Sequence, residues 1–271
     1  MNTVNAHTSE RTYRISAVEK AFVVLGLFST PPHRFTLSEI SARTQFSANQ
    51  SFRLLQTLVA VGYVRQIEDS KIYCLGHRAF GLVPALFNGD ELILASREAL
   101  DGVHAQTGEI VSLVVLEGDQ STICLYVRDD SDSPIVPAGI GSLSGHLHAG
   151  AVGRVLLAYS DDAAVDRYLD HNEPLHTFTD RTPKTREEVW RFIREIRTQG
   201  IAVSDGEVAS GMYGIAAPVR NRTGAVVAGI TLAAPISRSS AGDRERHRTL
   251  LMEAAKRIST NLGYRAVVAL G

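Results

Sequence analysis

The chain has 271 residues, which is long enough for two domains that each bury a core of their own. Hydrophobic residues make up 44% of the sequence and charged residues 21%, proportions that are typical of a soluble globular protein. Two cysteines in unrelated surroundings argue against a disulfide framework, and no apolar run suits a membrane span or a secretion signal, so we expect a cytoplasmic protein with no membrane partner.

The net charge of −1 conceals an uneven distribution of charged residues. Residues 1–88 carry nine Lys or Arg and five Asp or Glu, whereas residues 89–271 carry nineteen and twenty-four. A basic segment ahead of an acidic one fits a nucleic-acid-binding module joined to a second domain, but an excess this small is a weak indication by itself.

The first predicted helix follows residues 1–12, which we expect to be a disordered tail. Apolar residues at positions 15, 18, 22 and 25 recur at helical spacing, and the prolines at 31 and 32 end this helix after Ser29. A second, short helix begins at the capping box Thr36-Leu37-Ser38-Glu39, in which Thr36 and Glu39 satisfy free N–H groups of the first turn.

A third helix follows a turn at residues 44–46. Ser47-Ala48-Asn49-Gln50 has the form of a second capping box, and Gly62 ends the helix where left-handed backbone geometry favours glycine. Residues 63–67 and 71–75 then flank a polar turn and predict a β-hairpin. Three helices and a hairpin make a winged helix-turn-helix over residues 13–76, in which the second helix of the motif enters the major groove of DNA.

The third helix is predicted to bury one face and to present the other to DNA. The expected core-facing residues are Phe52, Leu55, Leu58 and Val59. On the polar face, Asn49 and Gln50 can pair with adenine, and Arg53 can pair with guanine or hold a phosphate. The candidates for phosphate contacts are Thr36, Ser47, Arg65 and Lys71. The alternative to DNA contact is an ordinary solvated surface, and we favour it for Gln56. For Lys71 we favour either a solvated surface or a contact to the DNA backbone alone.

The remainder of the chain predicts a second domain that mixes helices and strands. Residues 77–90 form a linker, with a helix at 77–87 and a break at 88–90. The further predicted helices cover residues 91–106, about 149–159, part of 183–198 and about 242–261. The predicted strands cover 110–117, 121–128, 214–220 and 225–233, with a Gly/Ser/Pro-rich segment at 131–145. Strands paired locally with helices outside them indicate an α+β domain with an antiparallel sheet, over residues 91–271.

Several short motifs in this domain are candidate sites of chemistry. The serines of 141–145 do not fit a nucleophile elbow in either register, and His146 with His148 is a weak metal pair because no third ligand is placed. Residues 150–154 open a helix and can receive an anion on free N–H groups, or they are small residues that allow close packing. Asp205 and Glu207 fit an acid–base pair and turn residues equally well.

Five segments resemble the IclR family of bacterial transcriptional regulators, in the order in which that family has them. "RISAVEKAFVVLGLFS", "FRLLQTLVAVGYV" and "KIYCLGHRAFGL" resemble its N-terminal region. "LHAGAVGRVLLAY" and "GIAVSDGEVASGMYGIAAPVRNRTGAVVAGITLAAPISR" resemble its effector-binding region. The resemblance runs from about Tyr13 to Gly263 and implies a homodimer or dimer of dimers that binds double-stranded operator DNA, with a small-molecule pocket in the second domain.

The resemblance, together with polarity, also suggests which residues contact the effector. They are Leu147, Ala151, Val152, Asp205, Gly214, Thr231 and Ala233. The sequence departs from the family where it usually has several consecutive acidic residues, here Ser204-Asp205-Gly206-Glu207, and at Gly214, where cysteine is common, so the identity of the effector does not carry over. We therefore expect a regulator of a catabolic operon that responds to a small organic or aromatic acid, with no cofactor and no metal. The alternative is a metabolic enzyme with an appended helical N-terminal domain.

Overall fold

The computed structural model describes two compact units, which we treat separately. The N-terminal unit comprises Met1–Phe87 and the C-terminal unit comprises Asn88–Gly271. The described residues are 13–29, 31–68, 70–82, 85, 88–118, 120–127 and 140–265. The predicted tail at residues 1–12 lies outside them. Within these ranges no helix is long and apolar enough to cross a membrane.

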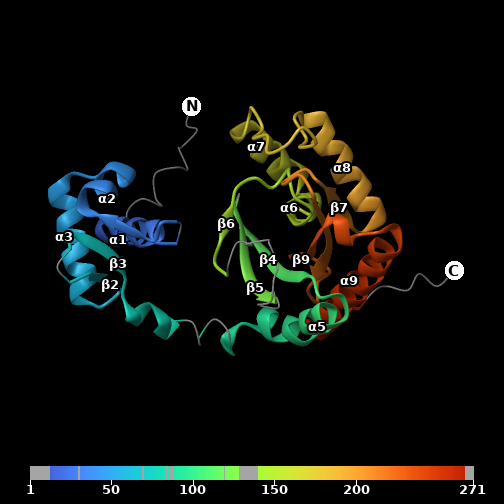
Figure 1. Cartoon of the computed structure of the whole chain (residues 1–271), viewed down its shortest axis with the longest axis horizontal. Coiled ribbons are helices and arrows are strands. Elements are labelled where there is room, and N and C mark those ends of the chain that lie inside the picture. The colour runs from blue at the N-terminus through green and yellow to red at the C-terminus, as the bar shows by residue number, and fades with distance from the viewer. Residues whose placement is uncertain are drawn as a thin grey trace, which may run out of the picture. The chain divides into compact units, whose positions relative to one another are not determined.

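The N-terminal unit contains the three predicted helices, α1 (Ser16–Leu27), α2 (Leu37–Thr44) and α3 (Ala48–Ala60), labelled in Figure 1. The predicted capping box at Thr36 is confirmed, because its hydroxyl accepts from the Glu39 N–H at 3.3 Å and its own N–H donates to Glu39 Oε2 at 2.7 Å. Gln45, with φ 58°, turns the chain between α2 and α3. These local signals fix where each helix begins.

The second predicted capping box forms only in part. The Ser47 hydroxyl accepts from the Gln50 N–H at 3.2 Å, but among the described contacts the Gln50 side chain makes no bond back to Ser47. One physical reason is that the amide of Gln50 is neutral, so it gains less than a glutamate carboxylate from the free N–H groups at a helix start. The Gln50 side chain thereby remains available for other partners.

A small antiparallel sheet completes this unit. Its strands are β1 (Arg34–Thr36), β2 (Val64–Gln66) and β3 (Ile72–Leu75), in the order β1-β3-β2. The predicted hairpin is β2 with β3, whereas β1 was not predicted and pairs through Arg34 opposite Cys74. The core between helices and sheet is made of buried residues: Val24, Phe28, Phe35, Ile40, Leu55, Leu58, Val64 and Tyr73.

Two apolar stripes are less buried than their periodicity suggests. On α3, Leu55 and Leu58 are core residues as predicted, but Phe52 is 46% exposed, so its assignment to the core was wrong. On α1, Phe22 is 67% exposed, as is Ile15 before the helix. Helical spacing identifies the apolar side of a helix, but the unit has only one layer of partners to cover it.

Residues 77–90 begin as a 3-10 helix, η2 (His77–Leu82). The predicted linker helix also includes residues 83, 84, 86 and 87, which lie outside the described residues, so its continuity stays a prediction. The division between the two units falls after residue 87, inside this predicted linker.

The C-terminal unit is built on one sheet of six antiparallel strands in the order β6-β5-β4-β9-β8-β7. The strands are β4 (Ile110–Glu117), β5 (Gln120–Val127), β6 (Leu143–Ser144), β7 (Ala202–Asp205), β8 (Met212–Arg220) and β9 (Val226–Pro235). The helices are α5 (Glu91–Thr107), α6 (Ala151–Ala158), α7 (Asp162–His171), α8 (Arg186–Gln199) and α9 (Ala241–Asn261), with a 3-10 turn η3 (Ile236–Arg238). The predicted α+β class and antiparallel sheet are confirmed, while β6, β7 and α7 were not predicted.

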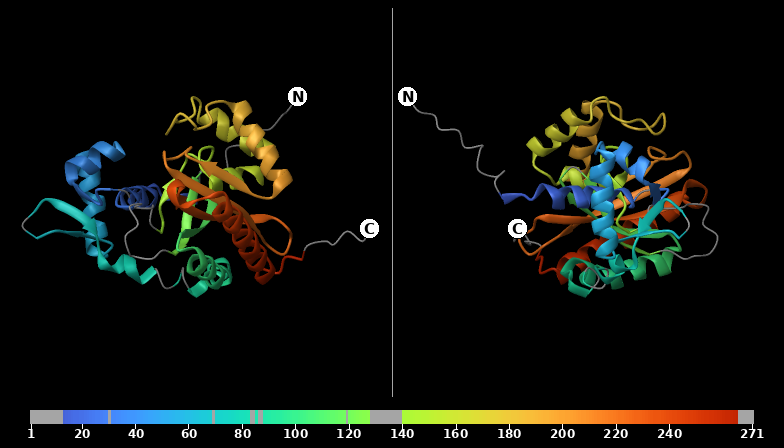
Figure 2. Two further views of the ribbon diagram at one scale, coloured as in Figure 1. Left: turned by 45° about the vertical axis from the view of Figure 1, so that its right-hand side comes forward. Right: turned by 90° about the vertical axis from the view of Figure 1, so that its left-hand side faces the viewer.

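Helices cover both faces of this sheet. Figures 1 and 2 show α5 and α9 on one face and α6, α7 and α8 on the other. The face under α6 carries small residues, because a side chain at Gly229 would approach Val152 Cγ2 to 2.8 Å. This close approach brings the start of α6 against the middle of the sheet, where the pocket described below is found.

Candidate functional site

The polar face of α3 forms one wall of a surface groove in the N-terminal unit. The other wall is the first part of α1. The lining residues are Ser16, Ala17, Lys20, Ser47, Asn49, Gln50, Arg53, Leu54 and Thr57. Asn49 and Arg53 are exposed and Gln50 is half-buried, so their amide and guanidinium groups are accessible from solvent. The groove therefore combines one cation from each helix with two amides that can both donate and accept hydrogen bonds.

Four of the seven predicted DNA-contacting residues meet in this groove: Ser47, Asn49, Gln50 and Arg53. Thr36 lies elsewhere, and its hydroxyl is engaged with Glu39 Oε2 at 2.8 Å. Arg65 on β2 and Lys71 beside β3 are exposed on the hairpin. Sequence reasoning missed Lys20, whose amine lies 5.7 Å from the centre of the Phe46 ring, because α1 was treated only as a core helix.

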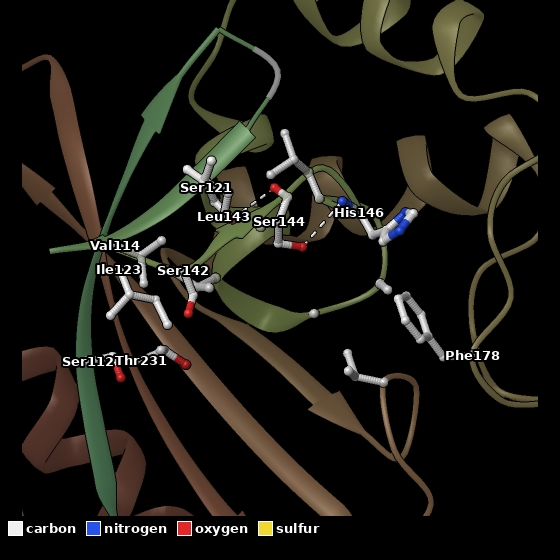
Figure 3. A pocket seen from close by; sticks show the side chains of 16 residues that line it. Ser112, Val114, Ser121, Ile123, Ser142, Leu143, Ser144, His146, Phe178 and Thr231 are labelled. Atoms are coloured by element: carbon white, nitrogen blue, oxygen red, sulfur yellow. Dashed lines mark hydrogen bonds between the residues drawn. The ribbon is translucent and has the colours of Figure 1, made fainter. Parts of the chain in front are cut away.

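The C-terminal unit contains a pocket of about 200 Å³ between the sheet and the start of α6 (Figure 3). Its apolar lining comprises Val114, Ile123, Leu143, Leu147, Ala149, Val152, Phe178 and Val208. Its polar or backbone lining comprises Ser112, Ser121, Ser142, Ser144, His146, Gly150, Gly153 and Thr231. An apolar cavity with a few placed hydroxyls is the usual character of a small-molecule site.

The pocket has an open end and a buried end. Phe178 and Val208 are 41% and 45% exposed, and they stand at the open end with His146. Ser112 is only 6% exposed and marks the buried end. Figure 3 shows Ser112 and Thr231 side by side, well away from His146 and Phe178. A ligand would therefore meet aromatic rings on entry and hydroxyl groups at the floor.

The start of α6 forms part of the wall. Gly150 is its N-cap, and no side chain caps the helix there, so N–H groups of the first turn are free to receive an anion. Gly153 is held against the backbone of Leu147, because a Cβ at this position would lie 2.4 Å from the Leu147 carbonyl oxygen. Both readings of residues 150–154, an anion-binding helix start and close packing, are compatible with this geometry.

Three of the seven predicted effector residues line this pocket: Leu147, Val152 and Thr231. The other four do not. Ala151 and Gly214 pack against each other beneath α6, since a Cβ on Gly214 would lie 3.9 Å from that of Ala151. Ala233 is the cross-strand partner of Gly214, so it is near these two residues and not at the pocket wall.

Asp205 also lies outside the pocket lining. It ends β7, and its carboxylate meets Arg244 of α9 at 3.0 Å and Arg181 at 3.7 Å. Arg244 satisfies Oδ2 and so joins β7 to α9, whereas Oδ1 is buried without a hydrogen-bond partner among the described residues. Glu207 has a separate set of partners, so the two carboxylates do not form an acid–base pair.

Sequence reasoning missed most of the pocket lining, including Ser112, Ser121 and Phe178. Ser112 interrupts the otherwise apolar strand β4, and that interruption was a usable signal of a polar surface facing a cavity. Ser121 stands between Gln120 and Thr122 at the polar start of β5, where the pattern gives no such signal. Phe178 comes from the segment between α7 and α8, far away in the sequence, and nothing in its local pattern indicates the pocket.

Glu207 and Arg154 form a buried ion pair behind the pocket wall. Arg154 is 0% exposed, and its Nη2 donates to Glu207 Oε1 at 3.3 Å and to the Val203 carbonyl at 2.7 Å. Glu207 Oε2 accepts from the Ser204 hydroxyl at 2.5 Å and from the Asp205 N–H. Burial lowers the pKa of Arg154, while the charge of Glu207 beside it opposes that shift.

The two segments that carry Phe178 and Val208 are joined by hydrogen bonds. The Thr179 hydroxyl donates to the Gly206 carbonyl at 2.7 Å, and the Thr182 hydroxyl donates to the Glu207 carbonyl at 2.6 Å. The buried ion pair therefore holds one segment, and the threonines attach the other segment to it.

Histidines gather at the open end of the pocket. The His146 ring stacks on His176 at 4.6 Å and meets Phe178 edge to face at 5.2 Å. Burial, followed by the charge of His176, lowers the pKa of His146. His148 is buried between the Tyr168 hydroxyl at 2.7 Å and the His176 carbonyl at 2.9 Å, and burial lowers its pKa. Among the described residues, no three His, Cys, Asp or Glu side chains are arranged to hold a metal ion.

Comparison with known proteins gives two family models that together span most of the chain. The model "Bacterial transcriptional regulator IclR C-terminal" matches residues 86–260, and the model "IclR helix-turn-helix domain" matches residues 17–68. The second match contains α2, α3, β2 and all of α1 after Ser16, and therefore every other residue that lines the groove at α3.

Similar proteins include regulators from several bacteria. The HTH-type transcriptional regulator KdgR of Dickeya chrysanthemi is 30% identical over 92% of this chain and 81% of its own length. The Pca regulon regulatory protein of Pseudomonas putida is 27% identical over 94% of this chain and 86% of its own.

Solved structures give the same result for the fold. A transcriptional regulator from Alicyclobacillus acidocaldarius matches with a TM-score of 0.84 and 28% identity, over 93% of this chain and 100% of that one. An IclR homologue from Microbacterium hydrocarbonoxydans, crystallised with 4-hydroxybenzoate, matches with a TM-score of 0.78 over 91% of this chain and 99% of that one. Its identity is 23%, so this second likeness concerns the fold alone.

Proposed function

Because this chain belongs to the IclR family of bacterial transcriptional regulators, we propose that it reads operator DNA with the start of α3 and is controlled by a small carboxylate in its C-terminal pocket. The observation that carries the DNA-reading part is the groove in which Asn49, Gln50 and Arg53 stand together. Amide side chains pair bidentately with adenine and guanidinium groups with guanine in the major groove. Lys20 beside them supplies a phosphate contact that adds affinity without reading sequence.

The hairpin and the helix starts supply the remaining contacts to the DNA backbone. Arg65 and Lys71 are exposed cations on the hairpin, and Thr36 and Ser47 lie at the N-termini of α2 and α3. Helix N-termini and cations both favour phosphate oxygens. Two copies of this unit would read a pseudo-palindromic operator, and the exposed apolar side chains Phe22 and Phe80 are available to help pair them as a homodimer or dimer of dimers in the cytoplasm.

The pocket suits a small acid as effector. The uncapped start of α6 at Gly150 offers N–H groups to a carboxylate, and the apolar walls suit its carbon body. An effector changes DNA binding only through its different affinity for the two arrangements of the regulator. Relatives named as regulators of a regulon or an operon support a set of catabolic genes as the target. A metabolic enzyme, the rival interpretation of the sequence, is set aside with the family assignment.

Two measurements test this function. Binding sites selected from random double-stranded DNA should be palindromic, and affinity for them should fall steeply with salt because counterions are released from phosphates. A thermal-shift screen of small carboxylates should then find acids that stabilise the protein, weaken or strengthen operator binding, and are recovered unchanged. Selection of no preferred sequence would overturn the DNA-reading assignment, and stabilisation only by non-acids would overturn the effector class.

A further inference from the structure

The floor of the C-terminal pocket carries a hydroxyl with no protein partner. Ser112 lines the pocket on β4 and is 6% exposed, and its hydroxyl makes no hydrogen bond among the described residues. Its oxygen is accessible from the cavity, since it is not among the fully buried atoms that lack a partner. A ligand that fills the cavity would bury this hydroxyl, and a buried polar group left unpaired is costly, so a ligand with a matching polar group is favoured.

Thr231 lies next to Ser112 and completes a polar floor. The two residues are direct cross-strand partners on β4 and β9, and Figure 3 shows their side chains together. The Thr231 hydroxyl donates to the Ile215 carbonyl at 3.0 Å, so its proton is used and only its lone pairs face the pocket. Ser112 offers both a proton and lone pairs. The floor can therefore donate one hydrogen bond and accept others.

A neutral hydroxyl group is the complement to this floor. It can donate to Thr231 and accept from Ser112, whereas a carboxylate has no proton to give. None of the residues that line the pocket is Lys, Arg, Asp or Glu, so a charge at the buried end would be unpaired and costly. The volume of the pocket also limits the size of the ligand. A dry cavity of about 150 Å³ holds benzene, and this pocket measures about 200 Å³.

We propose that Ser112, with Thr231, determines specificity by binding a neutral hydroxyl at the end of the effector remote from its carboxylate. This rests on the proposed function, which places the carboxylate at the start of α6. The effector is then a single-ring or similarly compact acid that carries a hydroxyl, and the unsubstituted acid is rejected because it leaves Ser112 unpaired. Sites built to bind a hydroxyl discriminate strongly against analogues that lack it.

The test compares acids that differ only at the group expected to reach the floor. Calorimetry on the full chain would use benzoate, the three hydroxybenzoates and terephthalate as probes. We expect one hydroxybenzoate to bind about tenfold more tightly than benzoate, and terephthalate to bind more weakly than benzoate. In Ser112→Ala the preference for the hydroxyl should fall to about twofold or less.

Thr122→Val is the matched control. Thr122 lies on the neighbouring strand β5, its hydroxyl is buried without a partner among the described residues, and it does not line the pocket. The variant should keep the tenfold preference. Equal binding of benzoate and every hydroxybenzoate, or a preference that survives Ser112→Ala, would overturn the floor assignment while leaving a carboxylate effector in place. Failure of all these acids to bind would overturn both this inference and the proposed class of effector.

Discussion

Replacing Glu207 by glutamine should destabilise the C-terminal unit strongly, because it removes the carboxylate that faces a fully buried arginine. Glu207→Gln leaves the Arg154 guanidinium with the Val203 carbonyl and the Phe192 ring, whose centre lies 4.2 Å from Cζ. Arginine remains protonated in proteins, so the charge stays buried. Removing one partner of a buried pair costs about 3–5 kcal/mol. For a unit of this size, that corresponds to a fall in Tm on the order of 10 °C.

A double variant separates the loss of charge from the loss of packing. In Arg154→Met combined with Glu207→Gln no buried charge is left unpaired, and the glutamine oxygen can still accept from Ser204 and the Asp205 N–H. Replacing a buried pair by apolar groups is often neutral, so the double variant should recover most of the stability that the single variant loses.

Urea unfolding followed by tryptophan fluorescence measures this effect in the correct unit. Trp190 on α8 is the only tryptophan in the sequence, so its signal reports on the C-terminal unit. Glu98→Gln, which removes a carboxylate from an exposed pair with Arg257, is the control and should change the free energy of unfolding by less than about 0.5 kcal/mol. A Glu207→Gln protein whose free energy of unfolding lies within about 1 kcal/mol of the wild-type value would refute the reasoning. A double variant that is no more stable than the Glu207→Gln single variant would also refute it.

Three further predictions concern the groove, the histidines and the start of α6. Asn49→Ala should lose about 1–3 kcal/mol of discrimination between operator and scrambled DNA, whereas Lys71→Ala should weaken the affinity for both DNAs equally. The measurement is a salt titration of binding to each DNA. Equal losses of affinity for the two DNAs in Asn49→Ala would argue against base reading. Burial lowers the pKa of His148 below 6.5, so below pH 6.5 the unfolded chain binds more protons than the folded one. The free energy of unfolding should then fall by up to about 1.4 kcal/mol per pH unit as the pH drops from 6.5 to the lowered pKa, and His148→Gln should flatten that slope in urea titrations at stepped pH. Gly153→Ala should cost about 1–3 kcal/mol by forcing its methyl group against the Leu147 carbonyl, and should weaken ligand binding in calorimetry; unchanged stability would mean that the backbone relaxes freely.

The sequence predicted the N-terminal unit well because its signals are local. The cap at Thr36, the cap at Ser47 and the glycine at 62 each act within a few residues, so helix boundaries could be read from them. Strand β1 escaped prediction because its pairing of Arg34 with Cys74 depends on residues forty positions away. The prediction that Phe52 is buried was wrong for a related reason. Periodicity gives the direction in which a side chain points, but it does not show which residues cover it.

The pocket could be predicted only in part because several separate elements build it. Leu147, Val152 and Thr231 were reached through resemblance, and the helix start at Gly150 through its glycines. Asp205 was expected to face the ligand, but its partner is Arg244, which belongs to the last helix and is invisible to local patterns.

The threonine bonds between the two segments at the open end have a kinetic consequence. Phe178 and Val208 belong to different parts of the chain, but Thr179 and Thr182 attach one segment to Gly206 and Glu207 of the other. Movement of either side chain away from the entrance therefore displaces both. Escape of a bound molecule should have one barrier and one rate constant, and its residence time should depend on these threonines even though neither lines the cavity.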